Sequence, residues 1–461
     1  MKPEEINNIL SSVEYLDADT LANYIFEGYL TLEQLMDTGE LIAAKRKEIE
    51  EIISGLEEDK RKKIAAEEEE KRRKESNDWK VAKNSKSVEL VSQFIEKYPN
   101  GNFYNEAIIF LDKLNSIVKE KSKILDSIRN ESSKYTPDDI LEFIESGHIS
   151  KNDLLSAGIP EVIVENLHQK KVNLSLGQTP ESIEKGYTEV YFWGLPGSGK
   201  TCALSAILSS GVSSGEILTN EGFGIHYMNQ LSNVFLTDFG VLPAPTHEDQ
   251  TQYLPFDLRD SQSDNHPIAL IELSGEIFKA FYKKKNNLQL SPKLEVTYQQ
   301  IKTYLQGENK KIHFFVIDVT VDPRKPIKGD TLTQQQYLNA MSLFLSNNNI
   351  LRNSAEGVFI IATKSDKLSS DFSIARTEVS SHLETYYPAL IKRLKDAIKD
   401  NKIGDGKKVE IIPFSLGQVY FNDLCYFDDT SSKNIIKVLQ NKTRKRKKSG
   451  LKDKLFNFFN R

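Results

Sequence analysis

The sequence predicts an α/β domain with a mostly parallel sheet, preceded by an all-α N-terminal region. From about residue 186, apolar segments alternate with helical patterns, as they do when helices cover both faces of a parallel sheet. A glycine-rich turn joins the first apolar segment to a helical one. Before residue 172 the periodic segments instead carry the start and stop signals of helices. The main strands are expected at 188–193, 268–273, 313–318, 358–362 and 409–413.

Composition limits the class of protein. The chain has 461 residues, more than one core of ordinary size holds, so about two to four domains are expected. No window approaches the roughly 18 consecutive apolar residues of a transmembrane helix, and the first residues contain no apolar secretion signal. Cys202 and Cys425 form no zinc or disulfide pattern and are expected to be small buried apolar side chains. These features predict a cytoplasmic protein.

An internal repeat organises the helical half. Residues 19–39 recur, diverged, at residues 138–158 with one constant offset. Each copy is predicted to be a short helix ended by a glycine, then a Thr or Ser N-cap that opens a second short helix. Because such a unit is too small to bury its own apolar face, the copies are expected to pack on each other or on what lies between them. The predicted units are residues 1–40 and 130–172.

Two different segments separate the copies. Residues 41–76 are rich in Glu, Lys, Arg and Ala with a thin apolar stripe, which predicts a solvated spacer helix or a short coiled coil. Residues 77–125 predict a helical hairpin broken at Pro99-Asn100-Gly101, with Trp79 and Phe94 in its core. The hairpin resembles "YPNG" units, which are similar to tetratricopeptide hairpins. We therefore expect the helical half to bind a protein partner or to self-associate.

The glycine-rich turn fits the phosphate-binding pattern G-x-x-x-x-G-K-[ST] between a strand and a helix. Its backbone N–H groups and the helix N-terminus attract anions. Lys200 is expected to reach the β- and γ-phosphates, and the hydroxyl of Thr201 to hold Mg²⁺. The predicted phosphate-binding residues are Gly194, Gly197, Ser198, Gly199, Lys200 and Thr201.

Three later segments favour a guanine nucleotide. Thr363-Lys364-Ser365-Asp366 ends a strand with T-K-x-D, where the aspartate accepts hydrogen bonds from guanine N1 and N2 and the lysine stem covers the base. Adenine offers no donor at that edge, so the carboxylate discriminates between the bases. Ser415, in Ser415-Leu416-Gly417, is placed to meet the guanine carbonyl. Glu272 to Glu276 ends another strand with E-x-x-G.

These motifs and their order resemble the translation-factor and Ras-related (TRAFAC) class of P-loop GTPases over residues 186–440. Within that class the chain looks most similar to bacterial double-GTPase-type domains, in which an "aGE" ending of this motif is usual. The resemblance implies a Ras-like domain that binds GTP or GDP with Mg²⁺. It implies that Glu272 touches Mg²⁺ through water and that the N–H of Gly275 bonds the γ-phosphate.

The resemblance also implies a switch-one threonine just before a strand at residues 252–258. Thr246 is the first choice and Thr251 the second; its hydroxyl completes the Mg²⁺ shell in the triphosphate state. Lys200, Thr246 and Glu276 are the expected catalytic residues. Glu276 stands where many GTPases have a water-orienting glutamine. Its charge faces the γ-phosphate, so slow hydrolysis accelerated by a partner or by dimerisation is expected.

Two alternatives remain open at this point. Phe314 to Asp318 matches a Walker B strand, so Asp318 is the candidate Mg²⁺ ligand of a P-loop ATPase. Alternatively, the chain is a nucleotide-binding scaffold with negligible hydrolysis, and the helical half is the working adaptor. Arg259 and Arg324 have no motif behind them and are expected to be surface ion-pair partners.

The C-terminal tail, residues 441–461, is basic. Residues 444–448 lead into a segment whose Leu451, Leu455 and Phe458 share one face at helical spacing. Three roles stay open: contact with an anionic membrane surface, a disordered solubilising tail, and a helix docked on the protein or a partner. Nucleic acid is not an expected ligand, because the rest of the domain is not basic.

Overall fold

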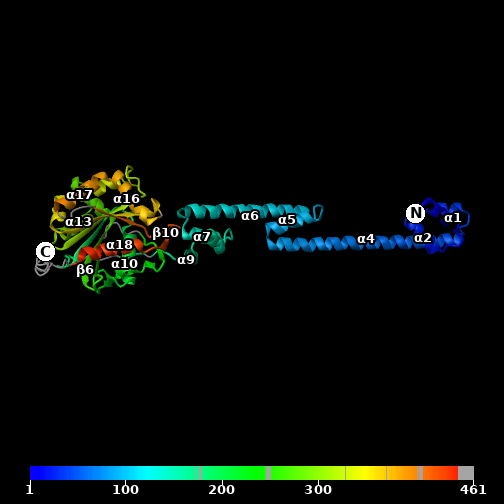
Figure 1. The fold of residues 1–461 in the computed structure, drawn as a ribbon, viewed down its shortest axis with the longest axis horizontal. Coiled ribbons are helices and arrows are strands. Elements are labelled where there is room, and N and C mark those ends of the chain that lie inside the picture. Colours follow the sequence, from blue (N-terminus) through cyan, green and yellow to red (C-terminus); the bar gives the residue numbers. More distant parts are fainter. Residues whose placement is uncertain are drawn as a thin grey trace, which may run out of the picture. The chain divides into compact units, whose positions relative to one another are not determined.

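The computed structural model describes residues 1–171, 173–175, 179–244, 251–327, 329–369, 371–401, 403 and 409–444. The chain divides into two compact units, Met1–Ser122 and Lys123–Arg461 (Figure 1). Among the described residues, none of the helices is long and apolar enough to cross a membrane.

The first unit is entirely helical. The first copy of the repeat forms α2 and α3, each opened by a side-chain cap: Asp17 accepts from Thr20 N, and Thr31 forms a capping box with Gln34. Buried side chains of this copy, including Leu21 and Leu35, pack on α4, which belongs to the segment between the copies. Its helices are α1 (Pro3–Leu10), α2 (Ala18–Phe26), α3 (Leu32–Asp37), α4 (Ala43–Ser85), α5 (Val88–Lys97) and the first part of α6 (Tyr104–Glu131).

Helix α4 is longer than the sequence predicted. The predicted boundary between a charged segment ending at residue 76 and a hairpin starting at residue 77 falls inside this one helix, and the expected boundary at residue 125 falls inside α6. Neither boundary has a glycine or proline to break the helix, so both helices run on. Residues 57–74 of α4 are exposed on all sides and carry i,i+4 ion pairs such as Glu58–Lys62.

The hairpin core gathers where α4, α5 and α6 meet. Trp79 packs on Phe94, with ring centroids 5.2 Å apart, and on Phe103 and Phe110. A buried carboxylate stabilises the turn at Pro99-Asn100-Gly101, because Glu75 Oε1 accepts a hydrogen bond from Phe103 N at 3.1 Å.

The second unit begins with the end of α6 and the second repeat copy. Ile140 of α7 and Leu154 of α8 pack on Ile128 of α6, again a helix from the segment between the copies. Its first elements are η1 (Ser132–Lys134), α7 (Pro137–Glu145), α8 (Lys151–Ser156) and α9 (Glu161–Glu165).

A seven-stranded sheet forms the centre of this unit, in the order β2-β5-β6-β1-β7-β8-β9. Strands β6, β1, β7, β8 and β9 are mutually parallel, whereas β5 is antiparallel to both of its neighbours. The predicted architecture is confirmed: an all-α region precedes an α/β domain with a mostly parallel sheet. The strands are β1 (Thr188–Trp193), β2 (Ile217–Thr219), β5 (Thr251–Arg259), β6 (Asn265–Leu273), β7 (Lys310–Asp318), β8 (Ala355–Thr363) and β9 (Glu410–Phe414).

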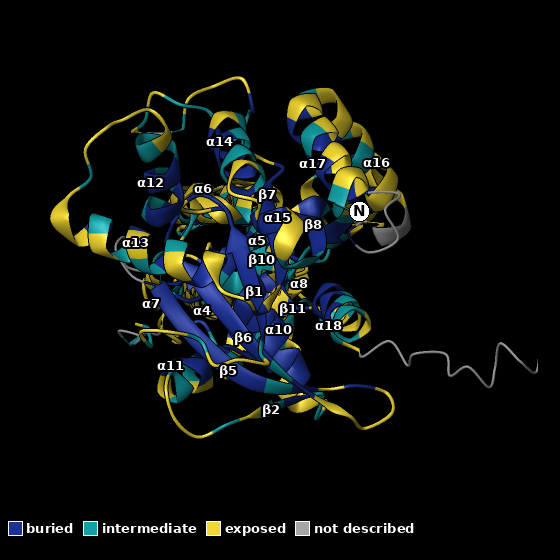
Figure 2. Ribbon diagram, turned by 90° about the vertical axis from the view of Figure 1, so that its left-hand side faces the viewer, coloured by how far each residue is buried: buried dark blue, intermediate teal, exposed yellow. Residues whose placement is uncertain are grey.

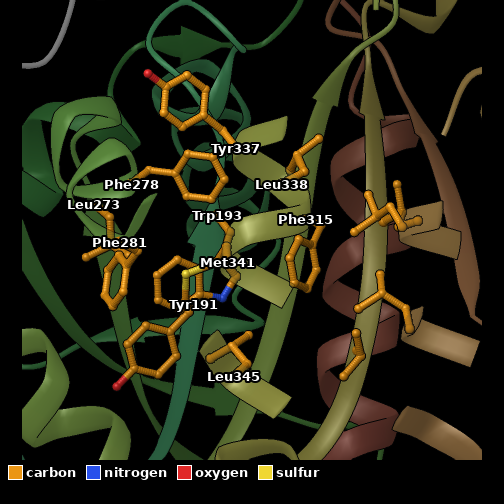
Figure 3. Packing of buried hydrophobic residues seen from close by; sticks show 14 of the residues in the cluster. Tyr191, Trp193, Leu273, Phe278, Phe281, Phe315, Tyr337, Leu338, Met341 and Leu345 are labelled. Carbon is orange, nitrogen blue, oxygen red and sulfur yellow. The ribbon is translucent and has the colours of Figure 1, made fainter. Parts of the chain in front are cut away.

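Helices cover both faces of the sheet, which explains why β1 and nearly all of β7 are buried (Figure 2). Alternate β1 side chains divide between two clusters: Tyr191 and Trp193 pack with α12 to α17 (Figure 3), and Val190 and Phe192 pack with α10, α11 and α18. The helices are α10 (Lys200–Ser213), α11 (Ile225–Ser232), α12 (Gly275–Lys285), α13 (Pro292–Gln306), α14 (Gln334–Asn347), α15 (Ile350–Asn353), η2 (Ser365–Lys367), α16 (Phe372–Tyr386), α17 (Pro388–Asn401) and α18 (Thr430–Thr443).

A second, four-stranded sheet connects the α/β domain with the second repeat copy. Its order is β10-β11-β4-β3, and the tip of the β10–β11 hairpin inserts Phe421 and Leu424 into the cluster of α7 to α9. Asn422 Nδ2 donates to Ser133 O at 2.8 Å, and Lys171 pairs with Asp423 at 2.6 Å. The strands are β3 (Phe235–Leu236), β4 (Phe239–Val241), β10 (Gly417–Tyr420) and β11 (Leu424–Phe427).

Candidate nucleotide site

The predicted motifs gather at one edge of the main sheet. Parallel strands β1, β6, β8 and β9 present their carboxyl ends there, and each is followed by one of the motif segments. Open α/β sheets bind ligands outside this edge. The order of strands therefore unites segments that are up to about 220 residues apart in the sequence (residues 194 to 415).

The glycine-rich loop has the backbone that the motif requires. Gly197 and Gly199 have φ angles of 76° and 82°, and Gly199 is the N-cap of α10. Lys200 Nζ donates to the loop's own carbonyls, to Gly194 O at 2.7 Å and to Leu195 O at 2.8 Å. Burial lowers the pKa of Lys200 to about 8, against an opposing influence of the Glu272 carboxylate.

Glu272 meets Thr201 directly. The Thr201 hydroxyl donates to Glu272 Oε1 at 2.5 Å, and the Tyr227 hydroxyl donates to Glu272 Oε2 at 2.7 Å. Glu272 lies beside the loop because β6 pairs with β1, where Glu272 is opposite Phe192. A hydroxyl and a carboxylate at this spacing are oxygen donors of the kind that Mg²⁺ takes together with phosphates and water. The described residues contain no cluster of three or more His, Cys, Asp or Glu side chains suited to a metal.

Gly275 lies against the phosphate loop. A Cβ added there would be less than 3.0 Å from the backbone N of Pro196. Ser274 caps α12, accepting from Ile277 N, so the N-terminus of this helix faces the loop. The two segments enclose a cavity of about 240 Å³, whose lining includes Gly197, Lys200, Thr201, Gly275 and Glu276.

Glu276 is held by a cation. Lys279 Nζ lies 3.0 Å from Glu276 Oε1 and 3.2 Å from Asp330 Oδ2. The expected water-orienting carboxylate therefore lines the cavity but is engaged in an ion pair within its own helix. Asp330, on the loop after β7, was not predicted as a site residue.

The two switch-one candidates differ in what the structure describes. Thr246 lies outside the described residues. Pro243 and Ala244, just before it, line the cavity. Thr251 starts β5 opposite Leu273, and its buried Oγ1 has no hydrogen-bond partner among the described residues.

Two of the residues predicted to recognise the base form a hydrogen-bonded pair. Ser415 Oγ donates to Asp366 Oδ1 at 2.9 Å, joining the T-K-x-D segment to the loop after β9. Thr363 Oγ1 donates to Ser198 O at 2.8 Å and so connects β8 to the phosphate loop. Lys364 adopts a left-handed φ of 58° and pairs with Asp318 Oδ2 at 2.6 Å, a partner that the motif alone does not reveal.

Asp318, the Walker B alternative, has other contacts. Its Oδ1 accepts from Thr320 N and Oγ1, and its Oδ2 pairs with Lys364. Glu272, not Asp318, bonds to the hydroxyl of Thr201. The geometry therefore favours Glu272 as the acidic residue beside a bound metal.

The two arginines lie away from the candidate site, whereas Cys202 lines its cavity. Arg259 ends β5 opposite Asn265, at the far edge of the sheet, and Arg324 pairs with Asp322 on the surface. Burial raises the pKa of Cys202 to about 11 and that of Cys425 to about 12; Cys425 is buried as expected, whereas Cys202 is partly exposed. A larger cavity of about 650 Å³ adjoins the amino-terminal halves of β8 and β9, away from every motif.

Comparisons with known proteins add little to this geometry. No protein-family model and no curated protein matches the chain. One of the solved structures that match is a Plasmodium falciparum protein described as nucleolar GTP-binding protein 1, with 13% sequence identity and a TM-score of 0.24. The match covers 56% of this chain and 89% of that chain.

Proposed function

We propose that this protein is a guanine-nucleotide-binding switch of the TRAFAC class that binds GTP or GDP with Mg²⁺ and hydrolyses GTP slowly. The observation that supports it best is the convergence of four motif segments on one sheet edge, joined by the Thr363–Ser198 and Asp366–Ser415 hydrogen bonds. A phosphate loop by itself does not select a base. The Thr363–Ser198 hydrogen bond joins this loop to the T-K-x-D segment and sets the distance between the residues proposed to bind the phosphates and those proposed to bind the base.

Each residue has a defined task in this proposal. Gly197, Ser198 and Gly199 offer backbone N–H groups to the phosphates at the N-terminus of α10, and Lys200 exchanges its bonds to loop carbonyls for phosphate oxygens. Thr201 holds Mg²⁺ directly and Glu272 holds it through water; the ion neutralises charge between the β- and γ-phosphates. Asp366 accepts the guanine N–H donors, and Ser415 orients that carboxylate.

Slow hydrolysis follows from the state of Glu276. Phosphoryl transfer depends mainly on positioning and charge stabilisation, so a misplaced water-orienting group leaves a low rate. The ion pair with Lys279 holds the Glu276 carboxylate within α12. The same observation supports the second candidate, a nucleotide-binding scaffold without appreciable turnover.

Nucleotide titration and phosphate release test the proposal together. Wild-type protein is expected to bind GDP and GTP much more tightly than ATP. Lys200→Ala loses binding of all of them, whereas Asp366→Ala loses the preference for guanine. Lys185→Ala and Asp264→Ala are matched controls, because both side chains are exposed and lie at the far edge of the sheet. Equal affinity for ATP and GTP would refute base recognition, and binding without phosphate release would establish the scaffold.

The roles of the other parts follow from this proposal. The helical half binds a protein partner or a second copy, and that partner accelerates hydrolysis. Contact of residues 444–461 with an anionic membrane surface stays a prediction, because residues 445–461 lie outside the described part of the chain. Vesicle sedimentation with and without anionic lipid measures it.

A further inference from the structure

Tyr227 touches the acidic residue of the site from outside every recognised motif. It lies on α11, it is 2% exposed, and its hydroxyl donates to Glu272 Oε2 at 2.7 Å. The Thr201 hydroxyl donates a hydrogen bond to the other carboxylate oxygen, Glu272 Oε1. Each carboxylate oxygen of Glu272 therefore accepts a hydrogen bond from a different helix, α10 on one side and α11 on the other.

The Tyr227 hydroxyl restrains the orientation of the Glu272 carboxylate. Glutamate has one more rotatable bond than aspartate, so its carboxylate needs an additional contact to keep one orientation. Glu272 is 1% exposed, and a buried carboxylate is costly unless it is hydrogen-bonded. Tyr227 supplies that bond with a side chain of only two torsions.

Helix α11 is itself fixed against both neighbours. Gly224, its N-cap, has a φ of 79°, and a Cβ there would lie less than 3.0 Å from the carbonyl oxygen of Tyr253 on β5. Met228 and Leu231 are buried with α10 side chains in the cluster on this face of the sheet. The Tyr227 hydroxyl therefore has little freedom to leave Glu272.

We propose that Tyr227 is a positioning residue that holds the Glu272 carboxylate in the orientation required for Mg²⁺ bound with the nucleotide. This inference rests on the proposed function. Mg²⁺ requires nearly ideal octahedral geometry, so the orientation of a group that bonds its water matters for its affinity. Loss of a hydrogen bond that orients a metal-binding group commonly reduces metal affinity about 10- to 100-fold.

The test measures Mg²⁺ dependence rather than turnover. Binding of a fluorescent GDP analogue is titrated with Mg²⁺ for wild type, Y227F and Y191F, and again in EDTA. We expect Y227F to need about 10- to 100-fold more Mg²⁺ for half-maximal effect, with unchanged GDP binding in EDTA. Y191F is the matched control, because it also removes a buried tyrosine–glutamate bond, Tyr191 OH to Glu189 at 2.6 Å, but on the other face of the sheet and away from the phosphate loop.

E272D alone tests the same contact from the carboxylate side and does not require Y227F to fold; the double variant adds a second test where Y227F folds. The shorter carboxylate cannot bond both hydroxyls, so E272D is expected to lose Mg²⁺ affinity as Y227F does. In the double variant Y227F/E272D, the second change is then expected to add nothing. Wild-type Mg²⁺ dependence in Y227F, or additive losses in the double variant, would overturn the role of Tyr227 while leaving nucleotide binding intact. A wild-type protein that binds no guanine nucleotide defeats the proposed function itself.

Discussion

The contact between Gly275 and the phosphate loop leads to a quantitative prediction for Gly275→Ala. The added Cβ would be about 1 Å short of the 3.4 Å at which ordinary contact with Pro196 begins. Neither neighbour yields easily, because Pro196 is constrained by its ring and Gly275 begins a capped helix. The α12 N-terminus and the loop must therefore separate by about 1 Å.

This separation has two effects whose free energies can be estimated. Forcing an extra methyl group into a packed contact costs roughly 1–3 kcal/mol of folding free energy. The proposed hydrogen bond from Gly275 N to the γ-phosphate is lost, and a bond to a charged group is worth about 1.5–3 kcal/mol, or roughly 10- to 150-fold in affinity. GDP has no γ-phosphate, so its affinity is expected to change little.

Equilibrium binding of a non-hydrolysable GTP analogue and of GDP, with denaturant unfolding alongside, measures both effects. Gly55→Ala is the control, because Gly55 lies in α4 with no atom within 4 Å of an added Cβ. If Gly275→Ala bound the triphosphate analogue as wild type does, the reasoning that assigns Gly275 to the γ-phosphate would be wrong. An equal loss for GDP and the analogue would show instead that the whole loop had been displaced.

Three further predictions concern stability. Gly55→Ala is expected to raise the free energy of unfolding by about 0.5–1 kcal/mol, since alanine is the better residue in an open helix interior; an unchanged denaturant midpoint would contradict this. Phe421→Ala is expected to lower the free energy of unfolding by about 3–5 kcal/mol, because a buried ring is lost. Phe421→Gly is expected to lower it by about 1–2 kcal/mol less than Phe421→Ala, because glycine adopts this φ of 53° without strain. A denaturant midpoint for Phe421→Gly at or below that of Phe421→Ala would contradict this. Burial lowers the pKa of His313 to about 3, so the neutral form persists in the folded state while the unfolded state takes up a proton below its pKa of about 6.5, and stability falls as the pH falls. Between pH 7 and 5 wild type is expected to lose about 2 kcal/mol more than His313→Asn, and parallel pH profiles of the two proteins would refute it.

Much of the α/β domain could be predicted because its strands are buried on both faces. Strand β1 begins and ends where expected, and β6, β7 and β8 extend the predicted segments by a few residues at their starts. The short strands β2, β3 and β4 and the β10–β11 hairpin were not predicted, because two to four residues carry too little periodicity. The hairpin turn also lacks glycine: Phe421 and Asn422 take positive φ angles of 53° and 62°.

The site was predictable where a local motif carries the chemistry and not where a distant side chain completes it. The phosphate loop and the Asp366 segment follow from spacing alone. Tyr227 and Asp318 act through bonds to Glu272 and Lys364 that sequence spacing does not indicate. No spacing rule along the chain announces such pairs.

The β10–β11 hairpin has a consequence for synthesis of the chain. The helical side chains of the core of α7 to α9 have all been synthesised by Leu167, but the core is completed by Tyr420, Phe421 and Leu424 of the hairpin. At about 5–20 residues per second, the intervening stretch of about 250 residues delays this closure by roughly 13–50 s. The second repeat copy therefore leaves the ribosome with an open apolar surface and finishes folding only after all seven strands of the main sheet have been made.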